Sequence, residues 1–184
     1  MSVTPLVPGT VGQHTGCLLV KVGQVLFRLA EDDLASLGLR VRHYSILQAL
    51  ADNGSMSQLS LGGYLRIDPA TMVSSLDDLE TADYAARARD PRDRRRHVVQ
   101  ITPAGRGVLS HINRRLLGGD ERALADLSPA ELRALHKALT KLSTGPTLPA
   151  MFDSVRDQTG SRNQTGRNQT GSRKMSSARS SVAP

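Results

Sequence analysis

The sequence predicts a mainly α fold of the α+β class, in which one small β-hairpin interrupts a series of helices. Apolar residues recur at helical spacing over most of the first 143 residues. Segments 84–89 and 97–101 are instead predicted to be paired strands, since Val99 and Ile101 alternate around a polar residue. Between them, residues 90–96 hold four arginines and a proline, which excludes a buried strand and predicts an exposed hairpin tip.

Helical spacing and capping signals predict four helices before the hairpin. They span 18–37, 42–51, 58–65 and 69–81. Ser57 is the expected N-cap of the third helix. Asp68 and Pro69 form a stronger start signal for the fourth. Because only Arg66 and Ile67 separate these two short helices, the pattern predicts a helix-turn-helix over 57–81.

The fourth helix is predicted to be amphipathic. We expect its core face to consist of Met72, Val73, Leu76 and Leu79. The remaining surface would hold Ala70, Thr71, Ser74, Ser75 and Asp78.

Two more helices follow the hairpin. Thr102-Pro103 opens the first, and we expect it to end at Gly118-Gly119. The segment Ser128-Pro129-Ala130-Glu131 fits a capping box at the start of the second. Its leucines at 132, 135, 139 and 142 form a narrow seam typical of coiled coils. In a small domain this seam favours a dimer interface over internal packing.

Composition bounds the core and the two ends of the chain. The 184 residues suit one domain with a tail, and since only 3% are aromatic, Leu, Val, Ile and Ala must fill the interior. Residues 1–13 are expected to be a flexible N-terminal arm. Residues 144–184 repeat Gln-Thr-Gly within a segment rich in Ser, Arg and Asn, which predicts a disordered basic tail.

The charge of the chain favours a polyanionic partner. A net charge of +7 and a pI of about 10.3 suit binding that releases counterions from phosphates. The few aromatic residues provide no stacking platform for single-stranded nucleic acid. A helix-turn-helix followed by an arginine-rich hairpin offers one helix to the major groove and one cationic loop to the minor groove. The sequence therefore predicts a winged helix-turn-helix protein that binds double-stranded DNA.

Other classes of function find little support in the sequence. Because it lacks a paired nucleophile and base, a glycine-rich phosphate loop and metal-ligand spacings, we expect no enzyme, no cofactor and no metal site. The single Cys17 suits a reducing cytoplasm, and packing in the core or an interface is favoured over redox sensing for it. No apolar run reaches transmembrane length, so we expect a cytoplasmic protein.

Three motifs occur in an order that is known from one family. They are Asp68-Pro69-Ala70-Thr71-Met72-Val73, Leu76-Asp77-Asp78-Leu79-Glu80, and an Asp-x-Arg-Asp-x-Arg wing followed by Ile101-Thr102-Pro103-Ala104-Gly105. Together they resemble the MarR family of bacterial transcriptional regulators over residues 14–143. The resemblance implies a homodimeric repressor on a pseudo-palindromic operator, released by a small anionic or phenolic effector. It assigns dimerisation to 14–37 and 103–143, and the wing to 84–102.

Carried over by position, the resemblance implies three groups of DNA-binding residues. Ser57 and Gln58 would meet the phosphate backbone at a helix start. The helix from 69 to 81 would present Pro69, Ala70, Thr71, Ser74 and Ser75 to the major groove. In the wing, Asp93 would orient Arg95 in the minor groove, and the phosphates would be held by Arg92, Arg94 and Arg96.

The resemblance also implies a ligand site and a dimer interface. Arg40, Arg42 and His43 would border the ligand cleft and bind an anion there, although a solvated helix start explains them equally well. The interface would contain Leu18, Val22, Leu132, Leu135, Leu139 and Leu142.

The chain departs from the family pattern at two turns. Arg66 and Asp83 stand where glycine is usual, so each is expected to need left-handed backbone. Arg66 is also a candidate phosphate contact. Two alternatives stay open from the residues alone: the wing arginines as a solvated loop, and a nonspecific or architectural DNA-binding protein without a ligand switch.

Overall fold

The computed structural model describes residues 4–90, 93 and 97–154. The chain divides into two compact units, residues 1–125 and 126–184. The first contains η1 (Gly9–Gln13), α1 (Thr15–Ala35), α2 (Val41–Asn53), α3 (Gln58–Leu65), α4 (Pro69–Thr81), β1 (Ala85–Arg89), β2 (His97–Ile101) and α5 (Pro103–Ala123). The second contains α6 (Pro129–Thr144) and a helical segment at 147–154.

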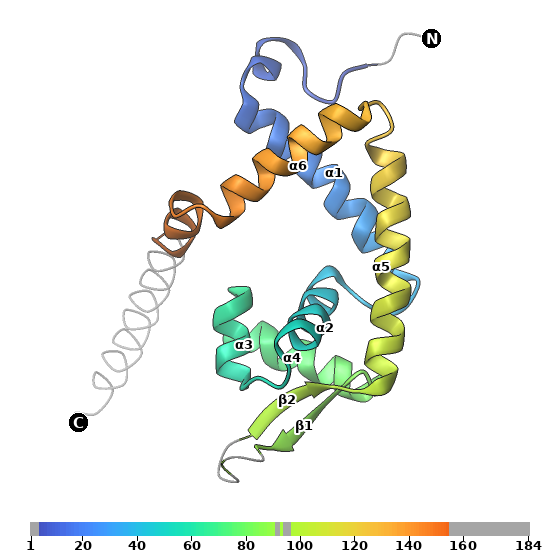
Figure 1. The fold of residues 1–184 in the computed structure, drawn as a ribbon, viewed down its shortest axis with the longest axis vertical. Coiled ribbons are helices and arrows are strands. Elements are labelled where there is room, and N and C mark those ends of the chain that lie inside the picture. Colours follow the sequence, from blue (N-terminus) through green and yellow to red (C-terminus); the bar gives the residue numbers. More distant parts are fainter. Residues whose placement is uncertain (1–3, 91–92, 94–96, 155–184) are drawn as a thin grey trace, which may run out of the picture. The chain divides into compact units, whose positions relative to one another are not determined.

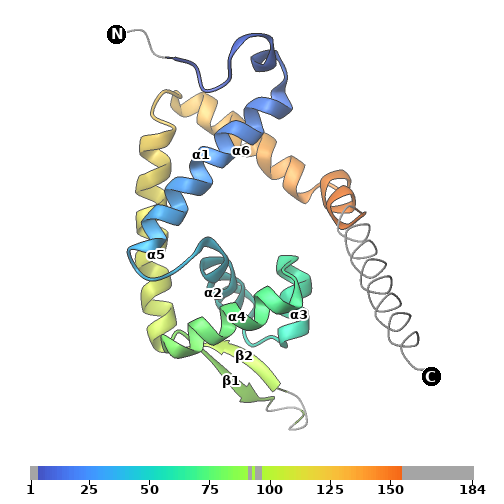
Figure 2. The same cartoon turned by 180° about the vertical axis from the view of Figure 1, so that it is seen from behind.

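The first unit is a winged helix-turn-helix with long flanking helices (Figures 1 and 2). Helix α5 packs against both α1 and α2, α3 and α4 pack on α2, and β1 lies against α4. The predicted helix-turn-helix and hairpin are therefore confirmed, and the bounds of α3 and α4 agree with the sequence pattern. No helix among the described residues is long and apolar enough to cross a membrane.

An aliphatic core holds the first unit together. Its fully buried side chains come from α1, α2, α3, α4 and α5, and the largest are Leu34, Ile46, Leu47, Leu50, Leu61, Met72, Leu76, Leu79 and Ile112. No aromatic side chain of the described residues is among the buried hydrophobic ones, which confirms the expectation of an interior filled by aliphatic residues.

The core face of α4 differs from the prediction at one position. Met72, Leu76 and Leu79 are buried, but Val73 is 42% exposed and Ser75 is fully buried in its place. Positions 72, 75, 76 and 79 share one face of a helix, whereas position 73 does not. The Ser75 hydroxyl tolerates this burial because it donates to the Thr71 carbonyl and accepts from Nε of Arg42.

Several element boundaries also differ from the sequence prediction: α1 spans Thr15–Ala35 instead of 18–37, and α2 spans Val41–Asn53 instead of 42–51. Helix α5 continues through Gly118 and Gly119 to Ala123. Each glycine costs a helix only about 1 kcal/mol, and packing of α5 on α1 and α2 offsets a cost of that size. The N-terminal arm contains the 3-10 helix η1, and residues 147–154 of the expected tail are helical. The rest of the tail lies outside the described residues.

Two non-glycine residues adopt left-handed backbone, as their departure from the family pattern predicts. Arg66 has φ 55° at the end of α3, and Asp83 has φ 58° at the end of α4. At the first turn, the amide of Ile67 donates to the Gly62 carbonyl, 3.0 Å away. This bond closes the helix end and leads the chain directly into α4.

The wing is an antiparallel hairpin that is anchored on both sides. Its register pairs Ala85 with Ile101 and Arg89 with His97. Met56, just before α3, exchanges two backbone hydrogen bonds with Val99. The hairpin is therefore fixed to the start of the helix-turn-helix as well as to α4.

Candidate functional site

Two side chains of the helix-turn-helix cap its helices. The Ser57 hydroxyl accepts from the Ser60 amide at the start of α3, and Asp68 accepts from the Thr71 amide at the start of α4. Hydrogen bonds from Thr71 hold the pKa of Asp68 below its ordinary value, so this cap is a carboxylate at neutral pH. Ser57 and Gln58 are half-buried at the helix start.

The exposed start of α4 is the part of the helix-turn-helix that can reach a groove. Pro69, Ala70 and Ser74 are exposed, and Thr71 is half-buried beside them. The expectation that Ser75 faces DNA is wrong, because its side chain is fully buried and bonded to Arg42 of α2. Arg66, which precedes this helix, is exposed at the turn.

The wing is held in place by a link between β1 and α4. The Arg87 guanidinium pairs with Asp77, 2.8 Å away, and with Glu80, while the Arg87 amide donates to Glu80. Asp93 is exposed near the tip. The predicted wing contacts Arg92, Arg94, Arg95 and Arg96 lie outside the described residues.

The three residues predicted to bind an anion join α2 to its neighbours. Arg40 pairs with Glu31 of α1, 3.1 Å away, and the same carboxylate caps the Val41 amide. Nε of Arg42 donates to Ser75 Oγ at 3.0 Å, and its guanidinium lies 3.9 Å from Asp78. Together these contacts connect α1, α2 and α4 through charged and polar side chains.

His43 is buried within this connection and does not face solvent. Its Nδ1 accepts from the Arg40 amide at 3.2 Å, and its Nε2 lies 3.3 Å from Asp78 without the alignment of a hydrogen bond. Burial, followed by the charge of Arg42, lowers the pKa of His43, although Asp78 and Glu31 oppose this. His43 is therefore a neutral structural residue at physiological pH and not a direct contact for an anion.

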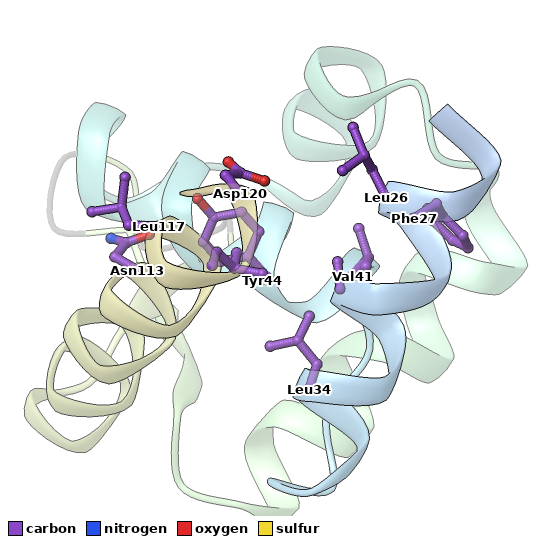
Figure 3. A pocket seen from close by; sticks show the side chains of 10 residues that line it. Leu26, Phe27, Leu34, Val41, Tyr44, Asn113, Leu117 and Asp120 are labelled. Atoms are coloured by element: carbon purple, nitrogen blue, oxygen red, sulfur yellow. The ribbon is translucent and has the colours of Figure 1, made fainter. Parts of the chain in front are cut away.

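A cleft of about 700 Å³ lies between α1, α2 and α5 (Figure 3). Its lining consists of Leu26, Phe27, Ala30, Leu34, Val41, Tyr44, Asn113, Leu116, Leu117 and Asp120. Its size and mostly apolar lining suit a small organic ligand. Arg40, Arg42 and His43 are not among the lining residues, so the structure places the cleft beside the predicted site.

Sequence reasoning missed the cleft because its residues resemble core positions. Leucines and valines on an amphipathic helix show the same spacing whether they meet a neighbouring helix or an open cavity. Asp120 gave one unused signal, since a carboxylate stands beside apolar Leu116 and Leu117 on the same helix.

The predicted interface leucines form exposed apolar surfaces on two helices. On α1, Leu18 is 41% and Val22 39% exposed. On α6, Leu132, Leu139 and Leu142 are between 39% and 46% exposed, and Leu135 is half-buried. Exposed apolar side chains at helical spacing along one helix are typical of a helix that has a protein partner.

Comparison with known proteins identifies the family of the chain. The MarR family pattern matches residues 37–96. A putative transcriptional regulatory protein for the hcr operon of Thauera aromatica is 30% identical over 138 residues, which are 74% of this chain and 83% of the relative.

Two solved structures share the fold. Bordetella bronchiseptica BpsR, whose DNA binding is regulated by 6-hydroxynicotinic acid, matches with a TM-score of 0.64 and 26% identity over 76% of this chain and 99% of that chain. The MarR family protein Rv2887 of Mycobacterium tuberculosis, in complex with p-aminosalicylic acid, matches with a TM-score of 0.61 and 27% identity over 71% and 99%. The winged helix-turn-helix, the matched family pattern and these relatives agree: the chain belongs to the MarR family of transcriptional regulators.

Proposed function

We propose that this regulator acts as a homodimeric repressor in the bacterial cytoplasm, and that a small molecule in the α1–α2–α5 cleft releases it from a pseudo-palindromic operator. Each protomer supplies the exposed start of α4 to one major groove and its wing to the adjacent minor groove. The observation that carries the DNA-binding role is the exposed face of Pro69, Ala70 and Ser74 on α4, the helix that precedes an arginine-rich hairpin.

The position of the cleft supports the release step. Val41 and Tyr44 of α2 line it, and Arg42 on the same helix holds Ser75 of α4. A ligand that moves α2 relative to α1 therefore changes the support of the DNA-facing helix. The small aromatic acids named for BpsR and Rv2887 support a ligand of similar size here.

Specific binding is tested by selecting genomic fragments with the purified full-length protein. The best duplex is then titrated against scrambled DNA at physiological salt. A two-fold symmetric sequence that binds at least about 1,000-fold more tightly than scrambled DNA supports the proposal. Equal binding to both supports the architectural alternative.

A substitution on α4 tests the assigned surface. Ser74→Glu places a negative charge where DNA would lie and should weaken operator binding by at least about tenfold. Ser110→Glu on α5 is the matched control, because both hydroxyls are exposed and both bond a carbonyl of their own helix. Equal effects of the two substitutions would show that α4 does not make this contact.

A further inference from the structure

The polar side chains of the cleft include a carboxylate, which would repel an acidic ligand. Tyr44, Asn113 and Asp120 supply its polar groups, and no Lys, Arg or His is among the lining residues that the structure describes. Figure 3 shows these three residues together at the α5 side, while Leu26, Phe27 and Leu34 of α1 lie at the other side.

Two side chains at the polar end of the cleft present hydrogen-bond acceptors beside the hydroxyl group of Tyr44. Nδ2 of Asn113 already donates to Gln48 Oε1 at 3.3 Å, and Gln48 in turn donates to Asp52 at 2.7 Å. This arrangement leaves the Asn113 carbonyl oxygen to accept from a ligand. The Asp120 carboxylate, which also lines the cleft, is a second acceptor.

The charged groups near the polar end of the cleft are negative. Burial and then the negative charges of Asp52 and Asp120 raise the pKa of Tyr44. Burial disfavours any charged group at this position, whereas the negative charges of Asp52 and Asp120 disfavour a bound carboxylate and favour a bound cation. The guanidinium groups of Arg40 and Arg115 do not counter these negative charges, because they pair with Glu31 at 3.1 Å and with Asp33 at 3.4 Å.

We propose that the cleft binds an arylalkylamine in its protonated form, with the ammonium group at Asp120 and the ring among the apolar side chains of α1 and α5. The apolar side chains of α1 and α5 would remove the ring from water, and the face of Tyr44, which lies near Asp120, would attract the cation. This ligand assignment rests on the proposed function and names the class of its effector. The ligands named for BpsR and Rv2887 are acids, whereas the cleft of this chain would prefer a cation.

Three probes with one ring system separate charge from shape. The full-length protein is titrated by calorimetry with 2-naphthylmethylamine, 2-naphthylmethanol and 2-naphthoate, which are cationic, neutral and anionic at pH 7. The amine should bind about tenfold more tightly than the alcohol, and 2-naphthoate should bind most weakly. Tighter or equal binding of 2-naphthoate, or no binding of any probe, overturns the inference.

A matched pair of variants assigns the preference to one carboxylate. Asp120→Asn keeps the shape of the side chain and removes its charge, so the amine and the alcohol should then bind within about twofold of each other. Glu121→Gln removes a charge from the next, exposed residue outside the cleft and should leave the tenfold preference unchanged. An unchanged amine affinity in Asp120→Asn overturns the inference.

Repeating the titrations on the operator-bound protein separates this inference from the proposed function. If the amine binds in an Asp120-dependent way and does not weaken DNA binding, the ligand class stands and the release mechanism fails. If 2-naphthoate releases DNA and the amine does not bind, the release mechanism stands and the ligand class fails.

Discussion

Gly105 explains why the motif Ile-Thr-Pro-Ala-Gly follows the wing. A Cβ atom at this position would lie 2.0 Å from the Tyr84 carbonyl oxygen and 2.9 Å from the Ile101 side chain. Thr102 accounts for another part of the motif, since its hydroxyl caps the Gly105 amide and donates to the Asp83 carbonyl. The two residues therefore join the start of α5 to the start of β1.

Replacing Gly105 by Ala should lower the free energy of unfolding by about 1–3 kcal/mol, because the backbone at Tyr84 must move away. Gly107→Ala is the control on the same helix, since its Cβ would meet nothing within 4 Å. That substitution should raise the free energy of unfolding by up to about 1 kcal/mol through helix propensity. Urea unfolding at a fixed protein concentration measures both. Equal effects would show that the close approach of the Tyr84 backbone places no constraint on Gly105.

At the scale of elements, α2 is the helix through which the cleft and the DNA-facing helix are connected. Its first turn is capped by Glu31 of α1, and Arg42 contacts Ser75 and Asp78 of α4. The same helix places Val41 and Tyr44 in the cleft. His43 lies at the centre of these contacts, so its protonation state affects how α1, α2 and α4 hold together.

Acid should weaken this connection through His43. Its folded pKa lies below the ordinary value near 6.5, so the unfolded chain takes up the proton first and stability is lost as pH falls below 6.5. Protonation also replaces the Nδ1 lone pair that accepts from the Arg40 amide by a donor. His43→Asn keeps an acceptor that does not titrate.

In the variant, the free energy of unfolding should therefore depend less steeply on pH. One group contributes at most about 1.4 kcal/mol per pH unit to this slope. Urea unfolding of both proteins between pH 5 and pH 8 measures the difference. The same slope in both proteins would show that His43 does not contribute to it.

At the scale of the whole molecule, the exposed apolar faces of α1 and α6 require a partner. Exposing these apolar side chains to water is unfavourable in free energy. Their burial between two copies of the chain therefore favours association. A dimer also doubles the contacts with a two-fold symmetric operator.

Leu135→Glu combined with Leu139→Glu should yield a monomer that binds operator about 100-fold more weakly, because the second half-site is lost. Ala134→Glu combined with Thr140→Glu adds the same charge to exposed positions of α6 away from the seam. Sedimentation velocity and operator titration compare the two proteins. A dimeric leucine variant would contradict the assignment of this interface.

The basic tail is predicted to add affinity without specificity. Residues 151–184 hold six basic and two acidic residues, and most of them lie outside the described part of the chain. Removing them should weaken binding to operator and scrambled DNA by similar factors and reduce the salt slope by at most about 5. Titrations of both duplexes over a range of salt concentrations test this, and loss confined to the operator would contradict it.

The sequence by itself determined the order of α1 to α6, the hairpin between α4 and α5, the bounds of α3 and α4, and the family of the chain. These features depend on short-range signals: caps at Ser57, Asp68 and Ser128, helical spacing, and left-handed turns at Arg66 and Asp83. Each acts within a few residues of the chain, so it can be recognised without tertiary structure.

Only the tertiary structure decided which surfaces stay open. In the folded chain, Ser75 is buried beside Arg42, and α5 continues through Gly118 and Gly119. A cleft also lies between helices that are distant in the sequence. The physical reason is that helical spacing specifies which residues share a face, whereas the packing partner decides whether that face is filled, polar or hollow.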